Sequence, residues 1–172
     1  MKYTIGIIGA STSNGFQPDK NALISAYKTG QLIAQNDAVL VCGGMSGVME
    51  AACRGASEAG GITVGLLPGD DKTGANAYVD VALPTGVGLM RNVLTVRACD
   101  AVIMISGGLG TLNELTVALN ERKVPAIVLT GTGGWSDRIK DIAYDGRYLD
   151  ERRSTPIHFA ATPEEAVQLA LQ

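Results

Sequence analysis

The stretch Ala101-Val-Ile-Met-Ile-Ser-Gly-Gly-Leu-Gly-Thr-Leu-Asn-Glu114 decides the fold of this chain. Its apolar start, Ala101 to Ile105, predicts a buried strand, and the glycines from Gly107 to Gly110 predict a tight turn. The residues after the turn, Leu112 to Leu119, have the apolar spacing of a helix. A strand that leads through a short turn into a helix is half of a strand–helix–strand unit, so we expect a parallel sheet covered by helices.

Apolar runs of the same kind recur along the chain, and helical patterns fill the intervals between them. The further runs are Tyr3 to Ile8, Val39 to Cys42, Ile62 to Leu67, Ala126 to Leu129 and Ile157 to Phe159. The helical patterns are Leu23 to Ala34, Val48 to Ala59, Leu89 to Ala98 and a last helix that starts at Thr162-Pro-Glu-Glu165 with a capping threonine, a first-turn proline and a capping-box glutamate. We predict an α/β fold, namely a Rossmann-like three-layer αβα sandwich with a mainly parallel sheet of about six or seven strands.

The length and composition suit one domain. The chain has 172 residues, of which 46% are hydrophobic, and this is enough for a substantial core. We therefore expect residues 1–172 to form a single Rossmann-like ligand-binding domain. Charged residues are 18% and the net charge is -3, so no overall field attracts nucleic acid or an acidic membrane surface. We expect neither as a partner, and a bound anion must be held by local geometry.

The cysteines and the histidine carry no signal of a metal site. Cys42, Cys53 and Cys99 are widely spaced in apolar surroundings, which indicates buried thiols in a reducing compartment. The first apolar run is interrupted by glycine and is too short for a signal peptide or a membrane span, so we expect a cytoplasmic protein. The single histidine, His158, lies on the last predicted strand, where we expect a packing role. We predict no metal site.

Three glycine-rich turns follow predicted strands. They are Gly9 to Gly15, Gly43 to Gly47 and Gly107 to Thr111. Glycine lets the backbone turn sharply and approach a ligand, and the start of the next helix presents free N–H groups to an anion. Because the carboxyl ends of parallel strands meet at one edge of the sheet, we expect one crevice for a phosphate-bearing small molecule. The alternative is that glycine only closes tight turns. The chain has neither the G-x-G-x-x-G dinucleotide fingerprint nor a P-loop.

Two features near these turns have both a structural and a functional interpretation. Thr111 and Glu114 form a T-x-x-E pair, which is typical of a capping box at a helix start. Glu114 could instead point across the crevice towards a ribose hydroxyl or a water. Arg91 lies at the start of the helix before the strand Ala101 to Ile105. It is either an exposed surface residue or a forked donor for a phosphate or carboxylate.

Three blocks of the sequence resemble one superfamily: Gly43-Gly-Met-Ser-Gly-Val-Met49, Met90-Arg91 and Gly107-Gly-Leu-Gly-Thr-Leu-Asn-Glu114. This superfamily, called SLOG, comprises Lonely-Guy phosphoribohydrolases, DprA-like proteins and molybdenum cofactor carrier proteins. The resemblance runs from Ile5 to about Gly134. The phosphoribohydrolases carry P-G-G-x-G-T-x-x-E and an arginine followed by lysine. In this chain Ser106 stands in the place of the proline and Asn92 in that of the lysine.

The carrier branch is the most similar to this chain. The shared features are the helix Ala52 to Gly61 with its pattern A-x-x-G-A-x-x-A-G-G, the turn Leu67-Pro-Gly69 and the block Gly88-Leu-Met-Arg-Asn92. The resemblance implies a protein that binds molybdenum cofactor, a phosphorylated pterin, as a carried ligand without turnover. It also implies a homodimer or homotetramer, with molybdoenzymes as recipients of the ligand. The implied ligand-binding residues are Gly9, Ser11, Gly43, Gly44, Ser46, Gly47, Arg91, Asn92, Gly107, Gly108, Gly110, Thr111 and Glu114.

The resemblance leaves a second function open, that of a nucleoside 5′-monophosphate phosphoribohydrolase of the cytokinin-activating type. Such an enzyme cleaves an N-glycosidic bond in an AMP-like substrate and needs no cofactor. Arg91 and Glu114 would then be the catalytic residues. Arg91 would fix the substrate, and Glu114 would bond the ribose or orient the attacking water.

Overall fold

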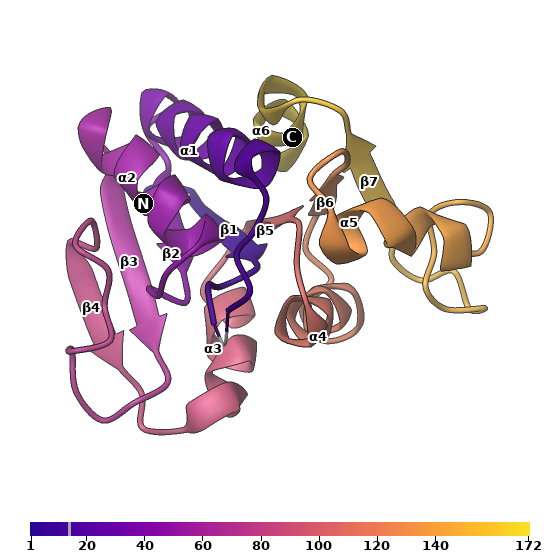
Figure 1. Ribbon diagram of the computed structural model, residues 1–172. Coiled ribbons are helices and arrows are strands. Elements are labelled where there is room, and N and C mark those ends of the chain that lie inside the picture. Colours follow the sequence, from indigo (N-terminus) through magenta and orange to yellow (C-terminus); the bar gives the residue numbers. More distant parts are fainter. Residues whose placement is uncertain (14) are drawn as a thin grey trace.

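The computed structural model describes residues 1–13 and 15–172, and its centre is a parallel β-sheet (Figure 1). The strands are β1 (Thr4–Gly9), β2 (Val39–Cys42), β3 (Ile62–Leu67), β4 (Val81–Pro84), β5 (Ala101–Ile105), β6 (Ala126–Leu129) and β7 (Ile157–Ala160). They are ordered β4-β3-β2-β1-β5-β6-β7, and every neighbouring pair is parallel. The prediction of a Rossmann-like α/β fold with a mainly parallel sheet is confirmed.

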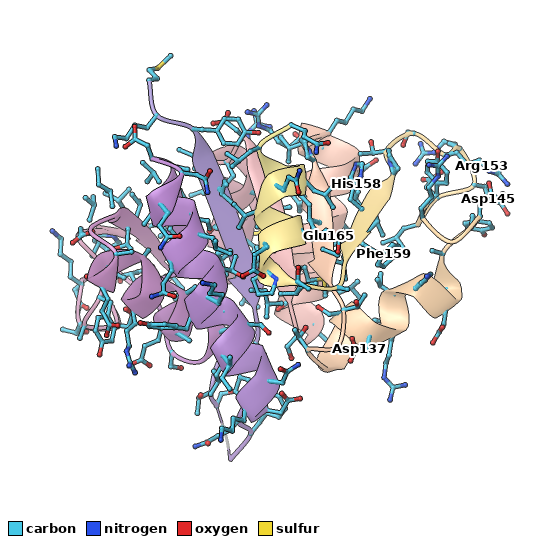
Figure 2. The ribbon with its side chains drawn as sticks, turned by 90° about the horizontal axis from the view of Figure 1, so that it is seen from above. Asp137, Asp145, Arg153, His158, Phe159 and Glu165 are labelled. Atoms are coloured by element: carbon cyan, nitrogen blue, oxygen red, sulfur yellow. The ribbon has the colours of Figure 1, made fainter. Side chains whose placement is uncertain are left out.

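Helices cover both faces of the sheet, and Figure 2 looks onto the face that carries α1 and α6. The α-helices are α1 (Lys20–Gln35), α2 (Val48–Glu58), α3 (Arg91–Arg97), α4 (Leu109–Val117), α5 (Gly134–Arg138) and α6 (Pro163–Ala170), and the shorter helical turns are η1 (Gly88–Met90), η2 (Ala118–Arg122) and η3 (Ile139–Ile142). Val48 and Ile103 share the core under α1, α2 and α6, whereas Leu115 and Met104 share the core under α3 and α4. Because strands such as β5 are buried on both faces, their sequences are continuously apolar.

The two edge strands differ from the expectations. β4 was not predicted, because it is short, ends in Pro84 and is mostly exposed, so it lacks the continuous apolar run of a buried strand. On β7 the expected packing role of His158 is wrong, because this side chain is exposed (Figure 2). An edge strand is open to solvent along one side, so a polar residue on it need not be buried.

Side chains cap the helices that begin and end the chain. At α1, the Asp19 carboxylate accepts a hydrogen bond from the Ala22 N–H at 3.0 Å. At α6, Thr162 caps as predicted, with its hydroxyl accepting from the Glu165 N–H at 3.2 Å. The Glu165 carboxylate accepts from the Ala161 N–H at 2.8 Å, one residue earlier than in a standard capping box.

The sheet changes direction between β1 and β5. From β1 the chain builds β2, β3 and β4 on one side, and it then returns through η1 and α3 to place β5 on the other side of β1. The loop after β1 leads to a helix on one face, and the loop after β5 leads to a helix on the opposite face (Figure 1). These two loops therefore separate at the carboxyl ends of β1 and β5, which opens a crevice.

The thiols of Cys42, Cys53 and Cys99 are free and buried, as the sequence predicts. No helix in the described part of the chain combines the length and the apolar composition that a membrane crossing requires.

Candidate functional site

A cavity of about 270 Å³ lies at the carboxyl ends of β1 and β5. The loop after β1, the start of α3 and the start of α4 form most of its wall. This is the place where open α/β sheets bind their ligands. The predicted site residues that line the cavity are Gly9, Ser11, Arg91, Asn92, Gly108, Gly110, Thr111 and Glu114. Asn14, which belongs to the first predicted glycine turn, lies outside the described residues.

Arg91 is the only cationic side chain among the described residues that line this cavity. Its exposed fraction is 5%, and its Nη1 donates to Oε1 of Glu114 at 3.2 Å. The Nε atom is buried, and no described residue accepts a hydrogen bond from it. An unpaired buried donor costs about 1–3 kcal/mol, and more when it is charged. The guanidinium is thus incompletely paired within the described chain.

Gly43 lies behind Arg91 and makes room for its guanidinium. A Cβ atom at Gly43 would lie 2.4 Å from Nη1 and 2.5 Å from Nη2 of Arg91, which is closer than real side chains approach. Any larger residue at this position would therefore displace the guanidinium. Gly43 is one of the predicted site residues. In the structure it supports Arg91 from behind and does not line the cavity.

Glu114 is buried next to Arg91 and does not form a capping box. Burial raises the pKa of Glu114 to about 7, although the nearby Arg91 charge acts in the opposite direction. The carboxyl group therefore exchanges its proton close to neutral pH. The N-cap of α4 is Gly108, and no side chain among the described residues caps it. The capping-box interpretation of Thr111 and Glu114 is wrong, because Glu114 pairs with Arg91 instead.

The start of α4 presents open backbone N–H groups. Within residues 1–13 and 15–172, no group accepts a hydrogen bond from the N–H of Gly108, Leu109, Gly110 or Thr111. Gly108, Leu109 and Gly110 are exposed at the cavity rim. The amino end of a helix carries partial positive charge and binds anions through such N–H groups. Arg91 and the α4 start thus offer complementary donors to one anion.

Ser106 sets the backbone of the turn that leads into α4. Its φ is +58°, in the left-handed region, and its N–H donates to Oγ1 of Thr132 at 2.8 Å. Its carbonyl oxygen accepts from Oγ of Ser136 at 2.9 Å. Proline could neither adopt this φ nor donate this hydrogen bond. The turn therefore has a backbone that the proline of the phosphoribohydrolase motif could not form.

Asn92 links α3 to α4 beside Arg91. Its Nδ2 donates to Oδ1 of Asn113 at 3.0 Å, and the side chain is buried. Because an amide is neutral, the position that holds lysine in the phosphoribohydrolases contributes no charge in this chain.

Several predicted site residues support the cavity from outside its wall. Gly44 accepts hydrogen bonds from Asn76, Ser46 donates to the Thr12 carbonyl at 3.2 Å, and Gly47 packs on the loop after β1. Gly107 has a φ of +116° and packs against Thr111. The structure therefore does not bring Gly44, Ser46, Gly47 or Gly107 to the cavity wall.

Apolar side chains that the sequence analysis did not select complete the wall. They are Ala10, Phe16, Met45, Met49, Leu89 and Leu109. Apolar residues in a sequence resemble core residues, so their type gives no sign of a ligand site. Leu89 and Leu109 are each 78% exposed, which a core role does not explain. Their positions in the sequence could have indicated the site, because Leu89 stands two residues before Arg91 and Leu109 stands between Gly108 and Gly110.

Comparisons with known proteins agree with this architecture. A family model described as the SLOG cluster4 family matches residues 2–167. An uncharacterized protein from Archaeoglobus fulgidus is 39% identical over 132 residues, which cover 74% of this chain and 83% of that protein.

Two solved structures resemble the whole chain. The molybdenum cofactor binding protein from the phototrophic bacterium Rippkaea orientalis is 34% identical, with a TM-score of 0.83 and coverage of 98% of this chain and 95% of that chain. The molybdenum cofactor carrier protein from Chlamydomonas reinhardtii is 29% identical, with a TM-score of 0.79 and coverage of 99% and 100%.

Proposed function

Because this chain belongs to the SLOG cluster4 family and resembles solved molybdenum cofactor binding and carrier proteins, we propose that it binds molybdenum cofactor as a carried ligand. The observation that carries this proposal is the juxtaposition in one cavity of Arg91, the only cationic side chain among its described lining residues, and the open start of α4. Both features suit the terminal phosphate of the cofactor.

In the proposed complex, the phosphate lies between Arg91 and the first turn of α4. The N–H groups from Gly108 to Thr111 donate to its oxygens, and Arg91 adds a charge-assisted hydrogen bond. Helix-terminal N–H groups and one arginine explain how a chain with a net charge of -3 binds an anion. The protonated form of Glu114 avoids repulsion between its carboxylate and the phosphate.

The cavity encloses only part of the ligand. Its volume of about 270 Å³ lies just below the range of roughly 300–1,000 Å³ that is usual for small-molecule sites. The apolar side chains of Met45, Met49 and Phe16 line the cavity, and they offer contacts to the pterin. The remainder of the cofactor extends past the rim formed by Leu89 and Leu109.

Retention of the cofactor tests the proposal. Purified protein is mixed with molybdopterin under anaerobic conditions and desalted, and the bound pterin is measured by fluorescence after oxidation. The native chain is expected to retain pterin, and Arg91→Gln is expected to weaken binding about tenfold or more, because a charge-assisted hydrogen bond is lost. Arg97→Gln is the matched control, since Arg97 is exposed and pairs with Glu121 at 2.9 Å. Failure of the native chain to retain pterin contradicts the proposal.

The acidic group of the cavity favours a second candidate, a nucleoside 5′-monophosphate phosphoribohydrolase. A buried carboxyl with a pKa of about 7 beside an arginine suits general acid–base chemistry. In this case Arg91 would hold the 5′-phosphate, and Glu114 would orient water against an oxocarbenium-like transition state. Ser106 and Asn92 differ from the hydrolase motif, so we rank this candidate second.

Release of free base distinguishes the two candidates. The chain is incubated with AMP and with cytokinin monophosphates, and the base is quantified by chromatography. A carrier releases none. Base release that Glu114→Gln abolishes, at unchanged fold, would establish the hydrolase and displace the carrier as the first candidate.

A further inference from the structure

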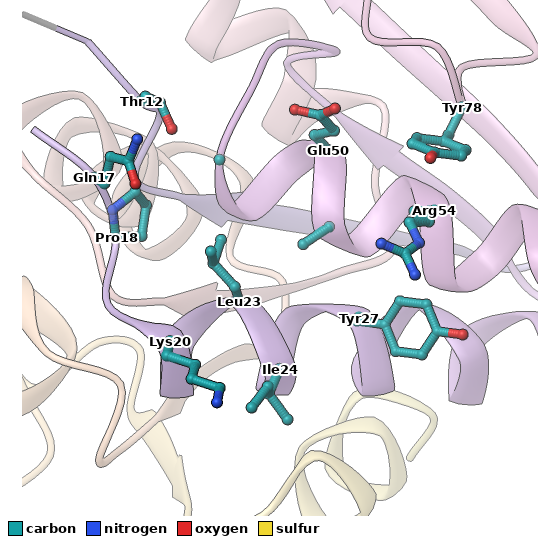
Figure 3. A pocket seen from close by; sticks show the side chains of 12 residues that line it. Thr12, Gln17, Pro18, Lys20, Leu23, Ile24, Tyr27, Glu50, Arg54 and Tyr78 are labelled. Carbon is teal, nitrogen blue, oxygen red and sulfur yellow. The ribbon is translucent and has the colours of Figure 1, made fainter.

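A second and larger cavity, of about 510 Å³, lies between α1 and α2 (Figure 3). We call it the α1–α2 pocket, and its wall includes Lys20, Leu23, Ile24, Tyr27, Ala51 and Arg54. None of its lining residues lines the Arg91 cavity. The loop after β1 separates the two, since Thr12 faces the α1–α2 pocket whereas Ser11 and Ser13 face the Arg91 cavity.

Close contact between the two helices at their centres creates this pocket. A Cβ atom at Gly30 would lie 2.0 Å from the Ala52 carbonyl oxygen, and one at Gly55 would lie 1.9 Å from the Tyr27 carbonyl oxygen. The backbones of α1 and α2 therefore touch at these glycines. Towards their amino ends the helices carry larger side chains, including Leu23 on α1, and a cavity remains between them.

Arg54 is held in place at one end of the α1–α2 pocket. Its Nε donates to Oε1 of Glu58 at 2.9 Å, and its Cζ lies 5.3 Å from the centre of the Tyr27 ring. The Tyr27 hydroxyl donates to Oε2 of Glu58 at 2.5 Å, which fixes the ring. In Figure 3 the Arg54 guanidinium lies between the rings of Tyr27 and Tyr78. No described residue accepts a hydrogen bond from its Nη atoms, so they remain as a forked donor.

The surroundings of the pocket favour a negative ligand. Lys20 also lines it, and no acidic group in the described ranges lies within ion-pair distance of Lys20. The amino ends of both helices point here, because Lys20 is the first residue of α1 and Gly47 is the N-cap of α2. Glu50 is the one acidic side chain among the described lining residues. Glu58, which pairs with Arg54, balances the second cation, so the preference for an anion rests on the helix dipoles and on the Arg54 Nη and Lys20 Nζ donors, for which no described residue supplies an acceptor.

The middle of the pocket is apolar. Leu23, Ile24 and Ala51 form it, and Ile24 is 56% exposed although it lies in a concave surface. The volume of about 510 Å³ falls within the range of roughly 300–1,000 Å³ for small-molecule sites. We propose that the α1–α2 pocket binds a small aromatic anion, with its ring on Leu23 and Ile24 and its anionic group on Arg54. This pocket shares no lining residue with the Arg91 cavity, although it includes Gly47, one of the residues that the resemblance implies for the cofactor.

The fluorescent probe 8-anilinonaphthalene-1-sulfonate, an aromatic sulfonate, tests this proposal on the intact chain. We expect saturable binding of one probe per chain with a blue-shifted emission. Arg54→Gln should weaken binding about tenfold, because the sulfonate loses a charge-assisted hydrogen bond. Ala51→Trp should abolish it by filling the pocket. The matched control Lys28→Gln removes a charge from α1 outside the pocket and should leave the affinity unchanged.

Other binding positions of the probe give different results. Loss of binding in Leu89→Ser, with Arg54→Gln unchanged, would place the probe on the exposed apolar surface and overturn the proposal. Loss of binding in Arg91→Gln would place it in the cofactor cavity and also overturn it. If Ala51→Trp does not fold, as judged by circular dichroism, Arg54→Gln decides, because Arg54 is exposed and its replacement leaves the core intact. If Arg91→Gln loses pterin retention but binds the probe with unchanged affinity, the change affects only the cofactor site and the proposal for the α1–α2 pocket stands.

Discussion

At the scale of single residues, Glu114 links the stability of the fold to pH. Its pKa is about 7 in the folded chain against an ordinary value of 4.5, because burial disfavours the charged form. Between these pH values the folded chain binds more protons than the unfolded chain, so the free energy of unfolding falls as pH rises through this window and levels off above it. The difference corresponds to about 3 kcal/mol.

Urea unfolding at pH 4.5, 6 and 8 measures this effect when the native chain is compared with Glu114→Gln. The native chain should lose up to about 3 kcal/mol relative to the variant across the window, since glutamine does not titrate. Parallel pH profiles for the two proteins would show that Glu114 does not titrate in this range.

Gly43 makes a second prediction at the same scale. In Gly43→Ala the new Cβ would lie 2.4 Å from Nη1 of Arg91, so the guanidinium must move. We expect a loss of stability of about 1–3 kcal/mol, as for an overpacked core, together with weaker cofactor retention. Gly69→Ala is the control, because nothing lies within 4 Å of a Cβ at Gly69. Thermal unfolding and the retention assay measure both effects, and equal behaviour of the two variants would contradict this role of Gly43.

At the scale of elements, the turn from β5 into α4 depends on a backbone that proline cannot adopt. Ser106→Pro loses the hydrogen bond to Thr132 and forces φ away from +58°. We expect at least about 2 kcal/mol of destabilisation. Ser106→Gly is the control, since glycine accepts this φ and keeps the N–H, and it should cost less than about 1 kcal/mol. Thermal unfolding compares the variants, and a stable Ser106→Pro would show that the turn can take the hydrolase form.

The elements also show which parts of the fold a sequence can predict. β5 was predicted with its observed bounds because burial on both faces makes every residue apolar. β4 was missed because it is an exposed edge strand. The helix α4 begins at Leu109, earlier than the predicted Leu112, because its first turn is exposed at the cavity and lacks the apolar spacing that marks a buried helix face.

The candidate site was predictable only in its polar part. Arg91 is the first residue of α3 and Glu114 lies in the second turn of α4, the helices before and after β5, and the structure pairs them at 3.2 Å. Met49 and Leu109 complete the same cavity, but apolar residues in a sequence do not reveal whether they face the core or a ligand. The capping-box interpretation failed because Glu114 pairs with Arg91. No sequence pattern showed that Arg91 would reach Glu114.

At the scale of the whole molecule, the rim of the Arg91 cavity carries an exposed apolar surface. This surface consists of Leu89, Met90, Leu94 and Leu109. Leu94 lies on α3 and Leu109 on α4, and these two helices are in contact. Exposed apolar groups beside a site commonly mark an interface between proteins. The cavity is also small for a whole ligand. We therefore predict a homodimer or homotetramer in which a second copy covers this surface and completes the wall.

Light scattering coupled to size-exclusion chromatography measures the assembly. The native chain should have the mass of two or four copies, and Leu89→Glu combined with Leu109→Glu should shift it towards one copy, because burying two charges in an apolar interface is unfavourable. The same variant should retain less cofactor, since the partner no longer closes the cavity. Ile142→Glu is the matched control, because Ile142 is 58% exposed and lies outside the cavity wall. A native chain that elutes as one copy at all concentrations tested would contradict the interface and leave the cofactor to be held by the walls of a single chain.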